Sequence, residues 1–159
     1  MSFDPARIFQ TLDDYGVDYL TIGGWAVVAH GYVRATEDVD FVADQEPDNI
    51  ERLARALASM GARLRGVDAD KLDIDPTDPE VLGNGASFTM ETDFGPVDFL
   101  NDVPGAGPYV EMRNRSVETS AAGVRIRVVG LDDLIAMKEA SGRDRDDLDV
   151  RELKRPSGS

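Results

Sequence analysis

Two aspartates, Asp38 and Asp40, lie two positions apart in the short apolar run 38–42. Side chains of a β-strand alternate between its faces, so both carboxylates would project from one face, about 6.5–7 Å apart at their Cα atoms. Carboxylates held side by side bind hard divalent cations, and pairs of such cations catalyse phosphoryl and nucleotidyl transfer. Two like charges repel unless something neutralises them, so the pair favours a metal site over an ordinary polar strand face.

A glycine pair, Gly23-Gly24, ends fourteen residues before Asp38. The pair follows a run of β-forming residues and precedes an apolar helical segment. Its backbone N–H groups would therefore lie at a helix N-terminus, where anions bind. Two glycines also occur in ordinary tight turns. The nearby carboxylates favour the phosphate site, because a nucleoside triphosphate requires both a phosphate cradle and a metal.

A third carboxylate is expected near the attacking group of a two-metal site. Asp98 is the candidate, because it lies between Val97 and Phe99 in an apolar strand where ordinary patterning would not place a charge. Glu91 and Asp93 are rivals in the same predicted hairpin, and Asp93 is better explained as a turn residue.

Two basic residues could complete such a site. Lys138 has the helical spacing of Leu131 and Leu134, so it starts from the buried face of its helix and must either pair with a carboxylate or reach a phosphate. Arg34 lies four residues before Asp38 and is a candidate phosphate contact or a partner of the carboxylate pair.

Two further polar residues have simpler explanations. Arg143 and Asp147 are four residues apart, so an ordinary intrahelical pair is expected between them. His30 is the single histidine of the chain and cannot build a zinc site alone, so a structural role at a helix end is expected.

The composition sets limits on the setting and the partners. The chain has 159 residues, no cysteine and a net charge of −14. It contains neither a membrane-spanning apolar run nor a signal-peptide pattern, so we expect a cytoplasmic protein without disulfides. The acidic excess argues against nucleic-acid binding through global charge and suits a cationic acceptor. A local basic patch stays possible. Its candidates are Arg113, Arg115, Arg125 and Arg127, with Arg63 and Arg65 as a second pair.

The elements that must position these residues follow from the apolar pattern. Helices are predicted over 4–15, 25–30, 47–60, 131–140 and 143–153. Strands are predicted over 17–22, 38–43, 62–65, 87–92, 96–100, 109–112 and 124–129. Segment 66–86 is rich in aspartate but lacks the EF-hand spacing, so a solvated acidic loop is expected. We predict a single domain over 1–155 and a disordered tail over 156–159.

The stretch GGWAVVAHGYVRATEDVDF resembles the nucleotidyltransferase fold of the DNA polymerase β superfamily. That superfamily combines a strand, a glycine pair, a helix, an acid-x-acid strand and a later third acid. The motifs His30-Gly31 and Arg34-Ala35-Thr36, and the late segment LDDLIAMKEASGRDRDDLD, are similar to the abortive-infection (AbiEii-type) toxin nucleotidyltransferases and their relatives. The resemblance covers about residues 17–153.

The resemblance implies an α/β (α+β) fold with a mixed, mostly antiparallel sheet flanked by helices. It implies that Asp38, Asp40 and Asp98 hold two Mg²⁺ ions, and that Asp98 also helps to deprotonate the acceptor hydroxyl. The residues expected to bind the NTP are Gly23, Gly24, Arg34, Thr36 and Lys138. The resemblance includes ATP binding but leaves open which NTP is used.

The resemblance leaves the acceptor open among RNA, a protein side chain and a small hydroxylated molecule such as an aminoglycoside. A toxin–antitoxin role is implied by the family alone. The larger toxins carry a helical domain after the core, so a partner, either an antitoxin or a second subunit, could supply what this chain lacks. The alternative from another class is a catalytically silent NTP-binding module, against which the three retained acids argue.

Overall fold

The computed structural model describes residues 3–66, 69–121 and 123–155. Its strands are β1 (Tyr19–Ile22), β2 (Val39–Ala43), β3 (Arg63–Leu64), β4 (Phe88–Thr92), β5 (Gly95–Phe99), β6 (Val117–Ala121) and β7 (Val124–Val128). Its α-helices are α1 (Pro5–Asp14), α2 (Gly23–Ala29), α3 (Pro47–Ser59), α4 (Pro79–Leu82), α5 (Tyr109–Asn114), α6 (Leu131–Ser141) and α7 (Asp144–Leu153).

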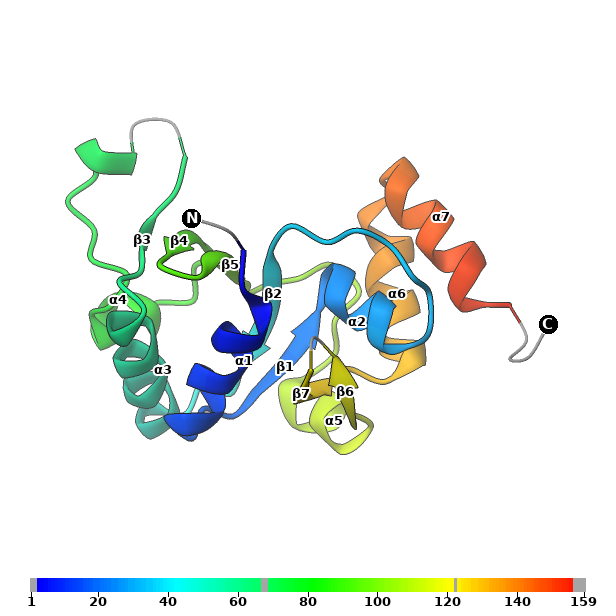
Figure 1. Ribbon diagram of the computed structural model, residues 1–159, viewed down its shortest axis with the longest axis horizontal. Coiled ribbons are helices and arrows are strands. Elements are labelled where there is room, and N and C mark those ends of the chain that lie inside the picture. Colours follow the sequence, from blue (N-terminus) through cyan, green and yellow to red (C-terminus); the bar gives the residue numbers. More distant parts are fainter. Residues whose placement is uncertain (1–2, 67–68, 122, 156–159) are drawn as a thin grey trace.

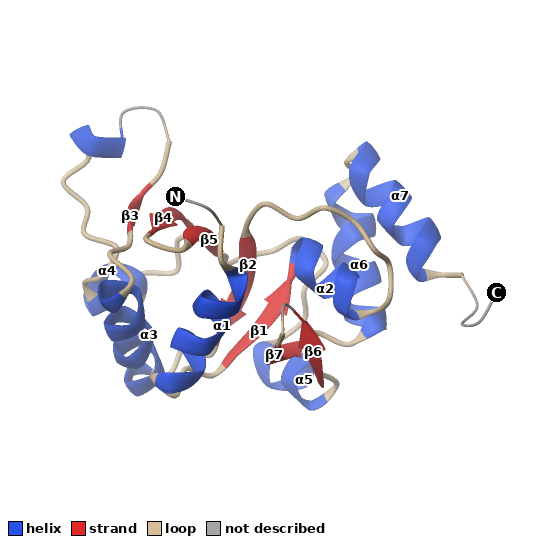
Figure 2. Ribbon diagram, in the orientation of Figure 1, coloured by secondary structure: helices blue, strands red, loops and turns tan. Residues whose placement is uncertain are grey.

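The strands form one sheet in the order β3-β4-β5-β2-β1-β7-β6 (Figure 1). The pairs β2–β5 and β1–β7 are parallel, and the other neighbouring strands are antiparallel. Helices flank this sheet, with α3 and α4 near one end of the molecule and α6 and α7 near the other (Figure 2). The predicted mixed, mostly antiparallel sheet with flanking helices is confirmed.

The first helix follows directly from its local sequence. Asp4 caps α1 by accepting a hydrogen bond from the Arg7 backbone N–H at 3.3 Å, and Pro5 occupies the first turn, where a missing N–H costs nothing. Ile8, Phe9 and Leu12 are fully buried on one face of the helix. This face packs α1 against β7 and α3.

The core between β2 and β5 is aromatic. Phe41 stacks on Phe99 with ring centroids 5.5 Å apart, and Phe99 stacks on Phe88 at 6.4 Å. Side chains alternate along a strand, so the neighbours of Phe41 and Phe99, which are Asp40 and Asp98, project from the opposite face of the sheet. Packing of the aromatic face therefore fixes the strands that carry the carboxylates.

The strand predicted over 109–112 is wrong, because these residues form α5. Pro108 precedes the helix in an extended conformation, and its carbonyl accepts the first helical bond from the Met112 backbone N–H at 3.0 Å. Val110 is 66% exposed while Met112 is buried. A helix of less than two turns has too few residues for its period to be told from the alternation of a strand.

Strand β6 was missed by the sequence analysis. Its residues include glutamate, threonine and serine, and most of them are exposed. It lies at the edge of the sheet and pairs with β7 alone. An edge strand with little apolar surface carries no strong pattern, because its stability comes from the ladder with its neighbour.

The acidic segment 66–86 is less irregular than predicted. It contains a short 3-10 helix over Ala69–Lys71 and the helix α4, which Asp78 caps by accepting a bond from the Glu80 backbone N–H at 3.0 Å. Leu82 anchors this segment in the core. The predicted tail 156–159 lies outside the described residues. In the part of the chain that is described, no helix has the length and apolarity to cross a membrane.

Candidate active site

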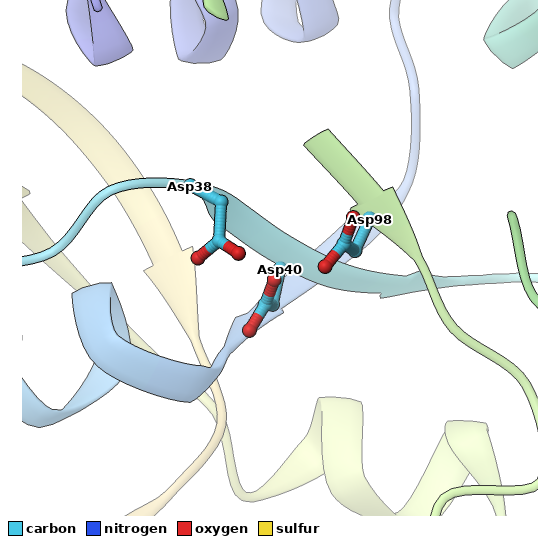
Figure 3. Close-up of side chains that lie close together, drawn as sticks. All are labelled: Asp38, Asp40 and Asp98. Atoms are coloured by element: carbon cyan, nitrogen blue, oxygen red, sulfur yellow. The ribbon is translucent and has the colours of Figure 1, made fainter. Parts of the chain in front are cut away.

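Three carboxylates converge where β2 and β5 run side by side (Figure 3). Asp38 directly precedes β2, and the parallel register places Asp40 opposite Asp98. Asp38, Asp40 and Asp98 each offer an oxygen atom, and these atoms lie within 4.8 Å of one another. Among the described residues they are the only such group, so the rival Glu91 lies outside it, while Asp93 occupies the hairpin turn.

The electrostatics of the triad favour a bound cation. Burial raises the pKa of Asp40 to about 8, and the charges of Asp38 and Asp98 add to the shift. Burial also raises the pKa of Asp98, and Asp38 contributes further. Asp40 Oδ1 is buried without a hydrogen-bond partner among the described residues. An orphaned carboxylate oxygen beside two more carboxylates fits the all-oxygen ligand set that hard divalent cations require.

The glycine pair lets α2 approach this strand closely. Gly23 has a φ of +68°, and a Cβ atom there would lie 2.3 Å from Asp40 Oδ2. A Cβ atom on Gly24 would lie 2.8 Å from Thr36 Cγ2. The first turn of α2 therefore has no room for side chains against Asp40 and Thr36. A phosphate contact of the two glycines stays a prediction.

All of the residues predicted to hold the metal ions or the NTP line one cavity of about 310 Å³. The structure thus brings together Gly23, Gly24, Arg34, Thr36, Asp38, Asp40, Asp98 and Lys138. Sequence reasoning missed four further lining residues, which are Glu37, Leu100, Arg143 and Asp146. A cavity of this size is within the usual range for small-molecule and cofactor sites.

The basic residues of the cavity pair with carboxylates on α7. Lys138 is 7% exposed, and its Nζ lies 2.9 Å from Asp146 Oδ1 and 3.2 Å from Asp149 Oδ2. Of the two alternatives for Lys138, carboxylate pairing is the one observed. Arg34 pairs with Asp149 at 2.5 Å, so the expectation of a pair with Asp38 or Asp40 is wrong.

The expected pair between Arg143 and Asp147 is also wrong. Arg143 Nε lies 2.6 Å from Asp146 Oδ2 instead. The reason is that α7 begins at Asp144, so Arg143 caps the helix and can reach the residue three positions later. Burial opposes ionisation of Asp146, but hydrogen bonds from Ser141, Lys138 and Arg143 outweigh it and lower the pKa of Asp146 to about 2.

Asp98 also has a basic partner that sequence reasoning did not find. Arg65 lies 3.1 Å from Asp98 Oδ1 and reaches it from the end of β3, across β4. In the sequence Arg65 is only a neighbour of Arg63, and nothing local marks it as a partner of residue 98. His30 contacts the Val129 carbonyl oxygen through Nε2 at 2.8 Å, which fits its predicted structural role at the end of α2.

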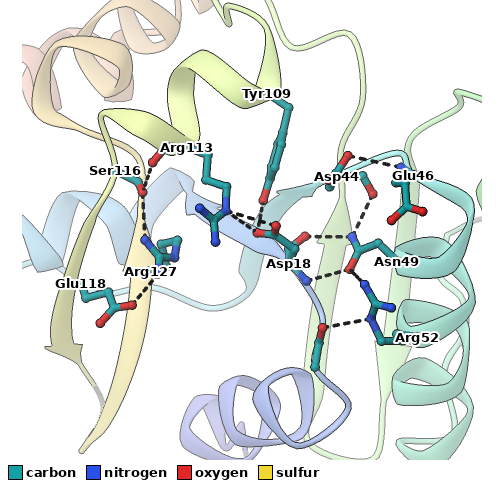
Figure 4. Close-up of polar contacts among 11 residues, drawn as sticks. Asp18, Asp44, Glu46, Asn49, Arg52, Tyr109, Arg113, Ser116, Glu118 and Arg127 are labelled. Atoms are coloured by element: carbon teal, nitrogen blue, oxygen red, sulfur yellow. Dashed lines mark hydrogen bonds and ion pairs between the residues drawn. The ribbon is translucent and has the colours of Figure 1, made fainter.

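The candidate basic patch consists of arginines that already have acidic partners, and Figure 4 shows Arg113 beside Asp18 and Arg127 beside Glu118. Arg113 binds Asp18 at 3.0 Å, Arg115 binds Asp133 at 2.9 Å, and Arg125 and Arg127 share Glu118. The pairs made by Asp18 and Glu118 lie around the N-terminal end of β1, whereas the triad lies beside its C-terminal end. Compensated arginines make a poor binding surface for a polyanion.

The sequence matches the model of a protein family described as "Nucleotidyltransferase of unknown function (DUF6036)" over residues 4–154. The chain belongs to this family. The protein is therefore a nucleotidyltransferase, an enzyme that moves a nucleoside monophosphate from an NTP to a hydroxyl acceptor. Enzymes of this kind generally use a divalent metal, and the triad provides a suitable ligand set. No curated protein matches the sequence.

Solved structures share the fold at low sequence identity. The lincomycin-bound lincosamide antibiotic adenylyltransferase LnuA has a TM-score of 0.64 and 17% identity, over 95% of this chain and 94% of that chain. A putative nucleotidyltransferase (TM1012) from Thermotoga maritima has a TM-score of 0.57 and 13% identity, over 93% and 88%. The antibiotic-resistance factor ANT(2'')-Ia in solution has a TM-score of 0.55 and 17% identity, over 94% and 80%. The AbiEii-type resemblance stays a prediction.

Proposed function

We propose that this nucleotidyltransferase uses Mg²⁺ and ATP to adenylylate a hydroxyl group of a small cationic molecule. The observation that carries the proposal is the convergence of Asp38, Asp40 and Asp98 within 4.8 Å in a cavity that also holds basic residues. The net charge of −14 and the compensated arginines favour a cationic acceptor over RNA. The fold neighbours include a lincosamide antibiotic adenylyltransferase and an antibiotic-resistance factor.

The acidic residues of the cavity would act on the reacting groups, and the glycines and basic residues would bind the triphosphate. Two divalent ions bound to the triad would neutralise charge on the entering and leaving oxygens of the displacement. Asp98 orients the acceptor hydroxyl and takes its proton, so that the oxygen attacks the α-phosphorus in line as pyrophosphate leaves. Gly23 and Gly24 give the triphosphate close access to the backbone, with Thr36 beside them. Lys138 and Arg34 lie where they can hold its charge.

Label transfer tests this proposal. The protein is incubated with Mg²⁺ and each α-labelled NTP, together with aminoglycosides, lincosamides, total RNA or cell lysate. We expect label from ATP on a small molecule, and much slower labelling with Asp98→Asn. Loss of the ligand and base should lower the rate by about 10²–10⁴. Glu91→Gln is the matched control, because Glu91 lies on neighbouring β4 outside the triad, and it should keep its activity.

The other outcomes separate the alternatives. Transfer of label to RNA or protein would show that the acceptor is not a small molecule and would leave the proposed nucleotidyl transfer unchanged. Mg²⁺-dependent NTP binding without turnover on any acceptor would support the silent NTP-binding module instead. If Asp38→Asn and Asp40→Asn both left metal and NTP affinity unchanged, the site itself would be misassigned.

The setting is a further part of the proposal. The absence of cysteine fits a cytoplasmic location, and the AbiEii-type resemblance fits a toxin with an antitoxin partner or a second subunit. Expression of the wild-type chain and of Asp98→Asn in a bacterial host tests the toxin role. Growth arrest with the wild type alone would support it, and equal growth would contradict it.

A further inference from the structure

A connected group of charged side chains borders the active-site cavity, and all of its members except Asp149 line it. We call it the α7 cluster, and it consists of Arg34, Lys138, Arg143, Asp146 and Asp149. The two aspartates come from one face of α7, three residues apart, and their residues are 0% and 2% exposed. Every ion pair of the cluster runs through one of these two carboxylates.

The three cations come from different parts of the chain, and ion pairs with the two aspartates bring them together. Arg34 belongs to the loop before β2, Lys138 to α6, and Arg143 to the junction between α6 and α7. Ser141 strengthens the junction, because its hydroxyl donates to Asp146 Oδ2 and its residue closes α6. All three cations line the cavity that contains the triad.

Stability alone is a weak reason for this arrangement. Burying charged groups costs several kcal/mol each, and well-packed apolar residues are often as stable as a buried ion pair. The cluster also has a net positive charge, because three basic side chains share two carboxylates. Among the described residues, Lys138 donates one hydrogen bond, to Asp146, and also forms an ion pair with Asp149, while Arg143 donates through its Nε alone. Donors therefore remain for a ligand.

We propose that Asp146 and Asp149 are positioning residues that hold Lys138, Arg34 and Arg143 as the binding surface for the polyphosphate chain of the nucleotide. The assignment rests on the proposed function and adds Arg143 as a direct phosphate contact. The triad and the α7 cluster then supply the metal ligands and the phosphate contacts of the same cavity. An NTP spans them, with its α-phosphate toward the carboxylates and its outer phosphates toward the cations.

Removal of one aspartate has opposite consequences under two explanations, which makes the proposal testable. If the carboxylate only repels the phosphates, Asp149→Asn removes a negative charge and binding becomes tighter. If it positions the cations, Arg34 and Lys138 lose their fixed geometry and binding becomes weaker. Inorganic tripolyphosphate is the probe, because it carries the phosphate chain without base, sugar or acceptor.

We expect Asp149→Asn and Asp146→Asn to weaken tripolyphosphate binding by about ten-fold in calorimetric titrations. Asp147→Asn is the matched control, because it removes the same charge from an exposed position on the same helix, and its affinity should equal that of the wild type. Equal or tighter binding by Asp149→Asn would overturn the proposal.

Arg143→Gln provides a second test in case Asp146→Asn or Asp149→Asn, which both change buried residues, fails to fold. The Arg143 side chain is 71% exposed, so its loss should leave the thermal unfolding midpoint in place. Tripolyphosphate affinity should still fall by about three- to ten-fold. Unchanged affinity in this folded variant would remove Arg143 from the phosphate surface.

Steady-state kinetics separate this inference from the proposed function. With an acceptor in hand, Asp149→Asn should raise the KM for ATP more than it lowers kcat, because the cations bind the phosphates and leave proton removal to Asp98. Asp149→Glu should recover part of the loss. If tripolyphosphate binding falls as expected but no acceptor is ever labelled, the phosphate surface stands and the proposed function fails. Efficient transfer with undiminished tripolyphosphate binding in Asp149→Asn would support the proposed function and contradict the phosphate surface.

Discussion

At the scale of single residues, Asp40 connects the electrostatics of the site to its chemistry. Burial, with the charges of Asp38 and Asp98, raises the pKa of Asp40 to about 8, so the metal-free carboxyl holds a proton at neutral pH. A carboxylate must be ionised to bind a metal, so cation binding has to release this proton. Because the proton and the metal compete for the Asp40 carboxylate, the affinity of the site for metal depends on pH.

We therefore predict that metal affinity increases as the pH rises from about 6 to about 8 and levels off above that range. Titration calorimetry with Mn²⁺ in two buffers of different ionisation enthalpy would report both the affinity and the proton released. Affinity that stays constant across this range would contradict the raised pKa. Glu91→Gln, which leaves the triad intact, should reproduce the wild-type pH profile.

Gly23 is a second residue whose identity the geometry explains. Its φ of +68° costs an L-residue about 1–2 kcal/mol, and a Cβ atom would also lie 2.3 Å from Asp40 Oδ2. Gly123→Ala is a matched control, because Gly123 has a φ of +81° and a Cβ atom there would meet no described atom within 4 Å. Both variants should lose stability in urea unfolding, but only Gly23→Ala should also lose metal affinity. Normal metal binding by Gly23→Ala would show that α2 can move away from Asp40.

At the scale of elements, the pairing of β2 with β5 determines whether the acids meet. Their parallel register sets Asp40 against Asp98, and the aromatic residues beside them hold that register on the other face. Phe99 is fully buried between Phe41 and Phe88. The precision of the site thus depends on packing that takes no part in the chemistry.

Phe99→Ala should lower the free energy of unfolding by about 3–5 kcal/mol, because it leaves a cavity in the aromatic stack. Val110→Ala, on an exposed position of α5, should change it by less than about 0.5 kcal/mol. Urea denaturation followed by circular dichroism measures both. A small effect at Phe99 would mean that Phe41 and Phe88 can close the gap.

Sequence reasoning succeeded where the information was local. The periodic helices α1 and α3 and the isolated charge of Asp98 in an apolar strand could all be found within a few residues. It failed at α5, where Tyr109, Val110 and Met112 fit two periods, and at β6, whose strand character depends on its neighbour. It also missed the partners of Arg34 and Arg65, because those pairs depend on how distant elements pack.

At the scale of the whole molecule, a net charge of −14 surrounds a site that gathers three carboxylates. Without a metal the folded state concentrates like charges that the unfolded chain would separate, and the protonation of Asp40 relieves part of this repulsion. Folding, metal binding and pH are therefore linked through one group near the centre of the sheet.

The sign of this linkage gives the last prediction. The pKa of Asp40 is about 8 in the folded protein and close to the ordinary aspartate value of 3.8 in the unfolded chain, so between these values the folded state binds more protons. The contribution of Asp40 to the stability of the metal-free protein is thus fully present below the unfolded pKa and is lost as the pH rises toward 8. Mg²⁺ at one hundred times its Kd should restore about 2.7 kcal/mol, a shift of roughly 5–11 °C in the unfolding midpoint. Differential scanning calorimetry of wild type and Asp40→Asn from pH 5 to 9 measures both effects. Since Asp40→Asn lacks the titrating group, its stability should decrease less with pH and respond less to Mg²⁺, and identical profiles for the two proteins would disprove the linkage.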